Sequence, residues 1–420
     1  MKKIFYIILT VAMATGFYSC SFQEKDIFDA PAAERLEQSI KDNLANFQSA
    51  SNGWVMQYFA YPETAGFPLI IKFGTDNFAT VMGRNSETGN VDLTKTGMYS
   101  VKTNEGTVLS FDTYNPVIHA FSDPDKNPLG YGYEGDFEFT IMSHTADMVR
   151  LKGKKRGINI YMNRLPEGQS WSSYFDAVYA FDAQTFKGAP NKLILIDGSK
   201  QIQVSGASGH ILTVGEDMYG FVVKPNGIHL EKPIAGLSAD ALDFELSADK
   251  SKLVSTVSPN IYFTGDNIYN AFVSSQVSNA QWAIVLDDSQ MGSTLQSLIA
   301  TVRASLAATG RTLNQILFKI DAVNSAKPFA VGIMITGGAI GHYHYDVTNT
   351  ANSVTYVSKG TCDNNGTVIK NNFAGTMDLI NAFEATYTLA SASDNGLSYK
   401  KIKVTSNSDS NFWFYIQKYN

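Results

Sequence analysis

Four oxygen-bearing side chains in one short stretch have the spacing of a calcium-binding loop. Asp123, Asp125, Asn127 and Glu134 occupy positions 1, 3, 5 and 12 of a twelve-residue window, and side chains at these positions bind the ion in calcium loops. Position 6 is Pro128, where the sharp turn needs a glycine, and both flanks read as strands rather than helices. We therefore favour a polar loop stiffened by proline. A calcium site is the alternative, and calcium is the one cofactor that the sequence suggests.

A second group of candidate ligands lies on a predicted strand near the C-terminus. Because side chains alternate along a strand, His342, His344 and Asp346 share one face and could present imidazole and carboxylate groups to a transition metal. The sequence has no HExxH motif and no Cys/His cluster with zinc spacing. The interpretation that we favour is a solvent-facing polar strand, with Tyr343 and Tyr345 packed inward.

Acid/base groups and aromatic rings gather in the first half of the chain. Paired carboxylates such as Asp112 and Glu138 could cleave a glycoside if they were held at a fixed separation. The chain has no G-x-S-x-G, phosphate-binding or dinucleotide-binding motif, so no catalytic residue is predicted. Tyrosines in a glycine-rich loop could stack on a sugar or a peptide. The predicted ligand-binding residues are His119, Tyr131, Tyr133 and Asp136.

Composition indicates a globular protein with more than one domain. The 420 residues are 44% hydrophobic and 17% charged, which is typical of a packed core. The formal net charge of −6 and the lack of a long basic stripe argue against a nucleic-acid partner. The only cysteines are Cys20 and Cys362, so no intramolecular disulfide is expected once Cys20 is modified.

The N-terminus has the pattern of a lipoprotein signal. A short basic start precedes the apolar run 4–14, and a small residue stands directly before Cys20. We predict that residues 1–19 are a signal peptide, that Cys20 carries the lipid, and that residues 20–28 form a tether. An ordinary cleaved signal is the alternative. The membrane, reached through the lipid, is therefore a predicted partner.

The remaining chain predicts a mainly β protein of the α+β class. An amphipathic helix with Leu36, Ile40 and Leu44 on one face should pack on an antiparallel barrel or sandwich within residues 29–166. A helical connector is predicted at 167–189. A second α+β unit of antiparallel strands with two or three helices is predicted at 190–420. Predicted strands include 54–61, 68–73, 117–121, 193–196, 227–230, 316–320, 341–347 and 367–371.

Two segments share a rhythm of apolar strand, polar hairpin and aromatic-rich strand. They are Val149–Met162 and Ile402–Tyr415, and each ends its half of the chain. A duplicated β unit is our hypothesis, although such hairpins also arise independently.

Several short motifs carry a family resemblance over most of the chain. They are Arg35-Leu36, Asn52-Gly53-Trp54, SFDTYNP at 110–116, His119-Ala120-Phe121, GDFEF at 135–139 and LKGKK at 151–155. This series resembles an uncharacterised lipoprotein family of Bacteroidota that often accompanies outer-membrane nutrient-uptake systems. The resemblance implies an outer-membrane location and an outer-membrane transporter as partner, and it implies no catalytic residue.

Acidic residues in the tether bear on which side of the membrane the protein faces. Glu24 and Asp26, separated by Lys25, resemble a surface-export signal of such lipoproteins, and retention on the inner leaflet is the alternative. The sequence therefore leaves three functions open. The one that we favour is non-enzymatic capture of a glycan, peptide or chelate at the cell surface. An envelope hydrolase of glycans or peptides and a structural or adhesive surface protein are the alternatives.

Overall fold

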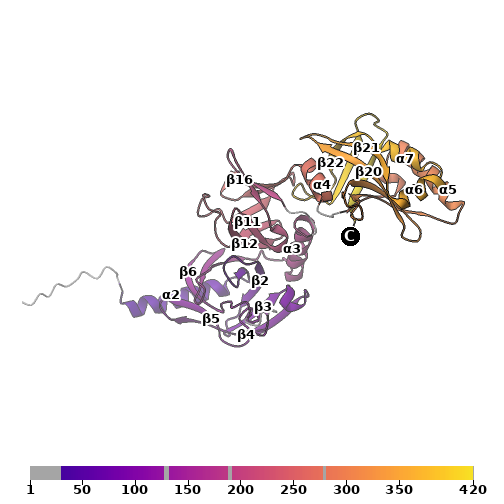
Figure 1. The fold of residues 1–420 in the computed structure, drawn as a ribbon. Helices are drawn as coiled ribbons and strands as arrows, with labels where there is room; N and C mark the ends of the chain where they lie inside the picture. The colour runs from indigo at the N-terminus through magenta and orange to yellow at the C-terminus, as the bar shows by residue number, and fades with distance from the viewer. Residues whose placement is uncertain (1–29, 127–131, 188–191, 278–280, 420) are drawn as a thin grey trace, which may run out of the picture.

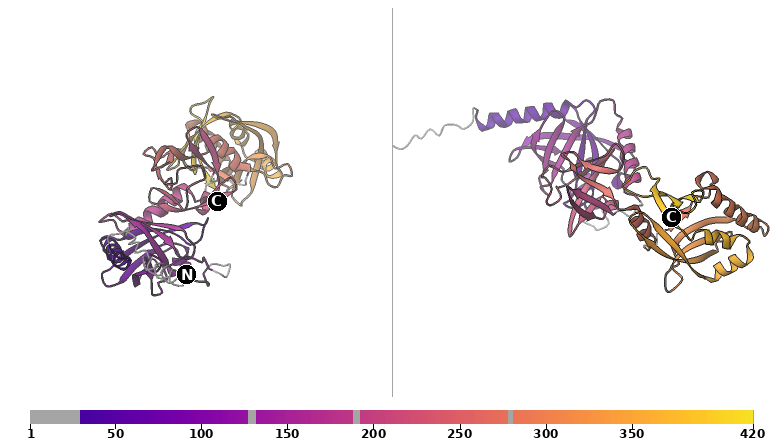
Figure 2. Two further views of the ribbon diagram at one scale, coloured as in Figure 1. Left: turned by 90° about the vertical axis from the view of Figure 1, so that its left-hand side faces the viewer. Right: turned by 90° about the horizontal axis from the view of Figure 1, so that it is seen from above.

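A computed structural model describes residues 30–126, 132–187, 192–277 and 281–419. The predicted signal peptide, Cys20 and the tether lie outside these ranges, as do Asn127 and Tyr131. The described strands form three antiparallel sheets that follow one another along the chain (Figure 1). Two of these sheets are closed barrels, and the third lies between them in sequence and in space (Figure 2). The prediction of a mainly β protein with antiparallel, barrel-like units is confirmed.

The first barrel consists of eight strands in sequence order. The pairing of β1 with β8 closes it, with Trp54 opposite Arg164. Side chains alternate along β1, so Trp54, Met56 and Tyr58 fill the barrel while Val55 faces the neighbouring sheet. The strands are β1 Trp54–Phe59, β2 Gly66–Phe73, β3 Phe78–Gly83, β4 Leu93–Thr103, β5 Thr107–Phe111, β6 Glu138–His144, β7 Met148–Gly153 and β8 Asn159–Arg164.

The predicted N-terminal helix is present as α2, Ala32–Gln48, and packs on the first barrel. Its Phe47 is fully buried and stacks on Phe73 of β2, with ring centroids 4.9 Å apart. Segment 117–121, predicted as a strand, is instead a turn that ends in the 3-10 helix His119–Phe121. The reason is local, because the side chain of Asn115 accepts a hydrogen bond from the Val117 amide and thereby starts the turn.

The middle unit is an eight-stranded sheet that begins after helix α3, Trp171–Thr185. Its strand order is β10-β9-β16-β15-β14-β13-β12-β11. Strand β12 approaches the first barrel so closely that a side chain at Gly220 would overlap the carbonyl oxygen of Thr64. The strands are β9 Leu193–Asp197, β10 Lys200–Val204, β11 Ile211–Val214, β12 Asp217–Lys224, β13 Gly227–Leu230, β14 Asp243–Leu246, β15 Lys252–Ser255 and β16 Ser258–Gly265.

The C-terminal barrel repeats the topology of the first one. Eight strands run in sequence order and β17 closes on β24, with Ile284 opposite Ile416. The strands are β17 Gln281–Ile284, β18 Leu313–Ile320, β19 Phe329–Ile335, β20 Ile340–Asn349, β21 Val354–Cys362, β22 Thr386–Ser391, β23 Lys401–Ser406 and β24 Trp413–Tyr419. The helices of this part of the chain are α4 Ile268–Val277, α5 Ser293–Ala307, α6 Asn364–Asn372 and α7 Thr376–Ala382.

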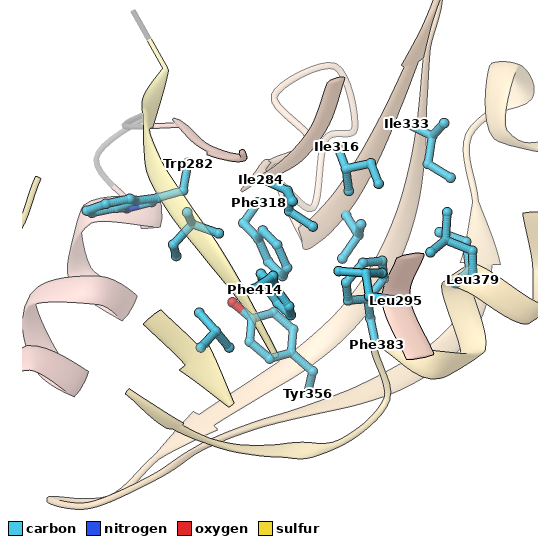
Figure 3. Close-up of a cluster of buried hydrophobic side chains, with 14 of the residues drawn as sticks. Trp282, Ile284, Leu295, Ile316, Phe318, Ile333, Tyr356, Leu379, Phe383 and Phe414 are labelled. Atoms are coloured by element: carbon cyan, nitrogen blue, oxygen red, sulfur yellow. The ribbon is translucent and has the colours of Figure 1, made fainter. Parts of the chain in front are cut away.

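The core of the C-terminal barrel joins strand and helix side chains (Figure 3). Phe318 of β18 and Phe414 of β24 lie with their rings nearly parallel and their centroids 5.8 Å apart. Leu295 of α5 and Leu379 of α7 belong to the same buried cluster. The two helices therefore contribute to the barrel core.

The structure differs from the sequence prediction in two further places. The range 190–420, predicted as a single unit, holds two separate sheets, and the predicted elements omitted β14 to β16, α4 and β17. Segment 367–371 was predicted as a strand from its Thr, Val and Ile, but it belongs to α6. The Asp363 side chain accepts a hydrogen bond from the Gly366 amide and caps this helix.

Candidate ligand-binding site

A cavity of about 470 Å³ lies between the outer face of the first barrel and the middle sheet. This volume is in the range of cavities that bind small molecules. Strands β1, β7 and β8 form one wall, and β13 with the segment that follows it forms the other. Among the lining residues are Gln57, Arg150, Asn159, Tyr161, His229 and Glu231.

The barrel wall of the cavity follows from the alternation of side chains along β8. Ile160 and Met162 point into the barrel core, so Asn159, Tyr161 and Asn163 face the cavity. Arg150 of β7 donates hydrogen bonds to the side-chain oxygen of Asn159, at 3.2 and 3.4 Å. This wall therefore consists mostly of amide and charged groups, with the aromatic ring of Tyr161 among them.

His229 of β13 is held on the opposite wall by an ionised carboxylate. Its Nδ1 lies 3.0 Å from Asp243 Oδ2, and Lys224 Nζ donates to Asp243 Oδ1 at 2.9 Å. Burial by itself would raise the pKa of Asp243, but the hydrogen bond from His229 and the charge of Lys224 lower it to about 2. Because a carboxylate can only accept, Nδ1 of His229 carries the proton.

Two buried polar atoms at this cavity make no hydrogen bond with the described part of the chain. They are Nε2 of His229 and Oε1 of Gln57, and the two side chains are only 1% and 2% exposed. An unpaired buried polar atom costs about 1–3 kcal/mol. With Nδ1 protonated, a neutral His229 offers its Nε2 lone pair as an acceptor. Both residues line the cavity, so a ligand that carries hydroxyl or N–H donors would find two unused acceptors there after small side-chain movements.

Charged residues at the rim connect the first barrel to the middle unit. Glu231 Oε2 accepts a hydrogen bond from the Glu63 amide at 2.7 Å, and Lys232 Nζ donates to Glu63 Oε1 at 2.6 Å. Burial raises the pKa of Glu231, and hydrogen bonding to Glu63 raises that of Lys232. These contacts fix the chain that follows β13 against the barrel, and so hold the two walls at a constant separation.

Other cavities among the described residues have fewer buried polar atoms that lack a hydrogen-bond partner. A groove of about 570 Å³ beside α2 includes Asn43, whose Oδ1 is buried without a partner. A cavity of about 230 Å³ at α3 includes Asn85, whose Nδ2 is in the same situation. The cavity at His229 combines two such atoms from two different folding units, which makes it the best candidate for a ligand.

Two of the residues predicted to bind a ligand make structural contacts within the first barrel. Asp136 is 6% exposed and its two carboxylate oxygens accept hydrogen bonds from the amides of Lys155 and Arg156, at 2.6 and 2.9 Å. His119 is buried, and its Nδ1 accepts a hydrogen bond from the Asn115 amide at 3.1 Å. Burial lowers the pKa of His119. Asp136 therefore braces the β7–β8 hairpin, and His119 braces the turn after β5.

The predicted aromatic site is described only in part, since Tyr131 lies outside the described residues. The hydroxyl of Tyr133 donates to Glu87 Oε1 at 2.7 Å. Its ring packs against Phe67 and Phe121, with centroids 6.3 and 5.8 Å away. Packing against the barrel therefore explains the position of the Tyr133 ring.

The loop predicted as an alternative calcium site also has internal contacts. Asp123 Oδ1 accepts a hydrogen bond from the Asp125 amide at 3.0 Å, and Glu134 forms an ion pair of 2.6 Å with Arg156. Within the described ranges, the group of three acidic or histidine side chains close enough to share a metal ion does not include these residues.

The acids considered for hydrolysis form an ion-pair network on the first barrel. Lys102 Nζ lies 2.8 Å from Glu138 and 3.8 Å from Asp112. The hydrogen bond to Lys102 lowers the pKa of Glu138, which is opposite to the shift that a general acid requires. Glu138 therefore lacks the electrostatics of the general acid in a glycosidase site.

The histidines of β20 are buried, so the prediction of a solvent-facing strand was wrong. His342 is 7% exposed and His344 is 4% exposed, because α6 and the segment after β18 cover this face. The neighbouring tyrosines, Tyr343 and Tyr345, pack into the core as predicted. Asp346 lies apart from both histidines and forms an ion pair of 2.6 Å with Lys359 at the surface.

The sequence analysis did not identify the residues of this cavity. Gln57 is the single polar residue in the apolar strand WVMQYF, and His229 is the single polar residue in GIHL. A lone polar side chain in a strand buried on both faces must find a partner or carry an unsatisfied group. These lone polar residues were visible in the sequence, but they could not show that β1 and β13 line the same cavity.

Comparisons with known proteins give a family and no function. A family model described as "Domain of unknown function (DUF4302)" matches residues 24–247. This range includes the first barrel, α3 and the cavity, and it ends within the middle sheet. No match is found among proteins with curated descriptions.

Solved structures give only distant similarities. A DNA polymerase beta subunit from Streptococcus pyogenes shows 12% identity, and the match covers 91% of this chain and 97% of that chain with a TM-score of 0.14. DNA polymerase III subunit beta from Borrelia burgdorferi shows 11% identity over 91% and 97% of the two chains, with a TM-score of 0.12. Scores this low carry no argument about this protein.

Proposed function

The chain belongs to the DUF4302 family, whose function is unknown, and we propose that it is a lipid-anchored surface protein that captures a polyhydroxylated ligand. One observation carries the proposal. His229 Nε2 and Gln57 Oε1 are buried at the same cavity, and neither has a hydrogen-bond partner among the described residues. A ligand that donates to both atoms would remove the cost of leaving them unpaired.

Among glycans, peptides and chelates, the lining of the cavity favours a glycan. A hydroxyl group donates and accepts at once, so it fits a wall on which acceptors alternate with donors. The amides of Asn159 and Asn163 and the guanidinium of Arg150 line the same cavity as the two unpaired acceptors. A volume of about 470 Å³ has room for one or two sugar rings.

A non-enzymatic role is supported by the composition of the cavity lining. The described residues that line it include no Ser, Thr or Cys, so a hydroxyl or thiol nucleophile for peptide or ester cleavage is missing, whereas carboxylates of the kind that cleave glycosides are present in Glu231, Asp240 and Asp243. A hydrolase is the second candidate, because a carboxylate that holds Nδ1 of a histidine also orients Nε2 as a general base. Release of product from a bound oligosaccharide would support the hydrolase, and binding without turnover supports capture.

The location is proposed from the sequence. Acylation of Cys20 would anchor the protein in the outer membrane with its body at the cell surface, where it could pass ligand to an outer-membrane transporter. Cys20→Ser should abolish incorporation of labelled palmitate and release the protein from the membrane fraction. Retention of the label in this variant would contradict the anchor, and resistance of the wild-type body to protease added to intact cells would contradict surface exposure.

A binding screen tests the ligand class. The full-length protein is exposed to panels of oligosaccharides, peptides and ferric chelates, and we expect binding to oligosaccharides. His229→Gln should weaken it at least tenfold, whereas His210→Gln should not, because His210 pairs with Asp182 at another cavity. Binding confined to peptides or chelates would contradict the glycan, and absence of any binding would favour the structural or adhesive role.

A further inference from the structure

Two basic side chains lie next to each other on the outer face of β7, at the barrel wall of the cavity. Arg150 and Lys152 are two residues apart, so they point to the same side of the strand, and both are exposed. Arg150 lines the cavity. Lys152 lies opposite Asn159 in the pairing of β7 with β8, and Asn159 also lines the cavity. Lys152 is therefore placed at the edge of the cavity, next to Arg150.

No acidic side chain lies opposite either of these cations in the sheet. Their cross-strand partners on β6 and β8 are Ser143, Thr140, Tyr161 and Asn159. Neither Arg150 nor Lys152 forms an ion pair with the described part of the chain. Residues two apart on a strand are separated by about 7 Å, and like charges at this distance repel each other. The fold therefore gains nothing from placing these two charges side by side.

Three neighbouring cations of the first barrel do have acidic partners. The ion pairs are Lys102 with Glu138 at 2.8 Å, Lys154 with Glu105 at 3.8 Å and Arg156 with Glu134 at 2.6 Å. Lys155, at the exposed tip of the β7–β8 hairpin, adds a further positive charge. The positive charge that no acid of the protein balances therefore begins at the cavity and follows β7 toward this tip.

The guanidinium of Arg150 is held in place and keeps donors for a ligand. Its Nε and Nη2 donate to Asn159 Oδ1, at 3.4 and 3.2 Å. Its Nη1 makes no hydrogen bond with the described residues. The edge formed by Nη1 and Nη2 has the fork geometry that matches the two oxygens of a carboxylate or a sulfate.

The acids at the cavity belong to the opposite wall, and each has a hydrogen-bond donor of its own. The donors are Lys224 and His229 for Asp243, the Glu63 amide for Glu231, and the Ser238 hydroxyl for Asp240. The negative charge of this wall is therefore engaged by groups of the protein, whereas the positive charge of the barrel wall is not. An anionic group of a ligand is expected at the barrel wall, on β7.

We infer that the ligand captured at this cavity is an acidic glycan, whose carboxylate or sulfate group binds Arg150 and Lys152. This inference rests on the proposed glycan capture and adds the charge of the ligand to it. The anionic group lies over β7 at the edge of the cavity, and the rest of the ligand occupies the cavity. Such a group removes the repulsion between the two cations, and its charge-assisted hydrogen bonds are stronger than those of a neutral hydroxyl.

Calorimetric titration of the full-length protein with matched probes tests the charge of the ligand. The probes are uronate-containing and sulfated oligosaccharides, each compared with its own carboxyl-reduced or desulfated form, which has the same backbone and no charge. We expect the acidic form to bind at least tenfold more tightly than its neutral form at low ionic strength. This advantage should shrink as sodium chloride is added, because salt screens the interaction between exposed charges. The uronate and sulfate probes together show which anionic group is preferred.

Variants of Lys152 test the position of the anionic group. Lys152→Gln should weaken binding of the acidic oligosaccharide at least threefold and Lys152→Glu at least tenfold, whereas binding of the neutral form should stay within twofold. Lys152 is exposed, so both variants should fold. Lys95→Glu is the matched control, because Lys95 is an exposed lysine on β4 of the same barrel and does not line the cavity. It should leave both affinities within twofold of wild type.

The outcomes separate this inference from the proposed glycan capture. Equal or tighter binding of the neutral forms, or equal affinity of Lys152→Glu and wild type for the acidic form, would overturn the acidic glycan and leave glycan capture standing. Failure of the folded wild-type protein to bind any oligosaccharide would contradict glycan capture itself, and this inference with it.

Discussion

Gln57 of β1 and His229 of β13 belong to different folding units, yet both line the same cavity and each has one buried polar atom without a hydrogen-bond partner among the described residues. Neither the first barrel nor the middle sheet requires, by its own folding, that these two residues line one cavity. It arises because β1 is buried on both faces, with one face in the barrel core and the other against the middle sheet. Exceptions to the pairing of buried polar groups often mark functional sites.

Removing the unpaired acceptor of Gln57 should stabilise the unliganded protein. Gln57→Leu keeps a similar volume and removes the desolvation penalty of Oε1, so the free energy of unfolding should rise by about 1 kcal/mol. Urea denaturation at pH 7 measures this change. Gln315→Leu is the matched control in the C-terminal barrel, because Oε1 of Gln315 is also buried without a partner. A loss of stability in Gln57→Leu would contradict the interpretation that Oε1 is unpaired.

The carboxylate of Asp243 should stabilise the fold at neutral pH and lose this effect in acid. Folding lowers its pKa from 3.8 to about 2, so the stabilisation is present above pH 4 and is lost as the pH falls toward 2. The shift corresponds to about 2 kcal/mol. Asp243→Asn should reduce the free energy of unfolding by about this amount at pH 7 and by about half as much at pH 3. Urea denaturation at both pH values checks this.

The stabilisation by Asp243 is assigned to its charged and hydrogen-bonding neighbours, and urea denaturation of a control variant tests this. Lys224 is the cationic partner of Asp243, His229 donates a hydrogen bond to it, and Glu245 lies 3.6 Å from Lys224 as a further acid. Asp217→Asn serves as control, since Asp217 is an exposed acid of the same sheet. A difference between wild type and Asp243→Asn that grew as the pH fell would contradict the assigned direction of the pKa shift.

The fold followed from the sequence where periodicity and turn chemistry agreed. Alternating apolar residues and glycine-containing turns located nearly all strands of the first barrel, and the four-residue spacing of Leu36, Ile40 and Leu44 located α2. The segment between Leu230 and Gln281 was not assigned, because its strands are short and only partly apolar. Their pairing with β9 and β13 across the sheet stabilises them, and such long-range contacts leave no local signal.

Asp136 should prove important for stability and not for binding. Asp136→Ala leaves the amides of Lys155 and Arg156 without their acceptor, so the free energy of unfolding should fall by about 2–3 kcal/mol. The affinity for an oligosaccharide should stay within twofold of wild type at a temperature where both proteins are folded. Asp125→Ala, at an exposed loop position, should change stability by less than about 0.5 kcal/mol. Loss of binding in folded Asp136→Ala would restore the earlier prediction of a site at this residue.

Gly341 should be intolerant of even one added methyl group. In Gly341→Ala the new Cβ would lie 2.7 Å from the Gly366 Cα, so α6 must shift away from β20. We expect a loss of about 1–3 kcal/mol in the stability of the C-terminal barrel, because the shift of α6 disrupts its packing on β20. Gly209→Ala is the control, since no atom lies within 4 Å of its added Cβ. Unchanged stability in Gly341→Ala would show that the contact is relaxed in solution.

The candidate site was harder to predict than the fold, for a physical reason. The sequence pattern marked side chains that are neighbours along the chain, such as Asp123 and Asp125 or His342 and His344. In the structure the groupings of polar residues cross between elements, since His229 lines the same cavity as Gln57 and His342 is hydrogen-bonded to Asp363. Alternation along β20 correctly placed the two histidines on one face. It could not show that α6 and the segment after β18 would cover that face.

Calorimetric titration of the full-length protein with a bound oligosaccharide from the screen tests the central claim most directly. Wild type and Gln315→Leu should bind with the same affinity. Gln57→Leu should bind at least tenfold more weakly, because it lacks one of the two acceptors while its fold is at least as stable. Equal affinity of Gln57→Leu and wild type would contradict the assignment of this cavity as the ligand-binding site.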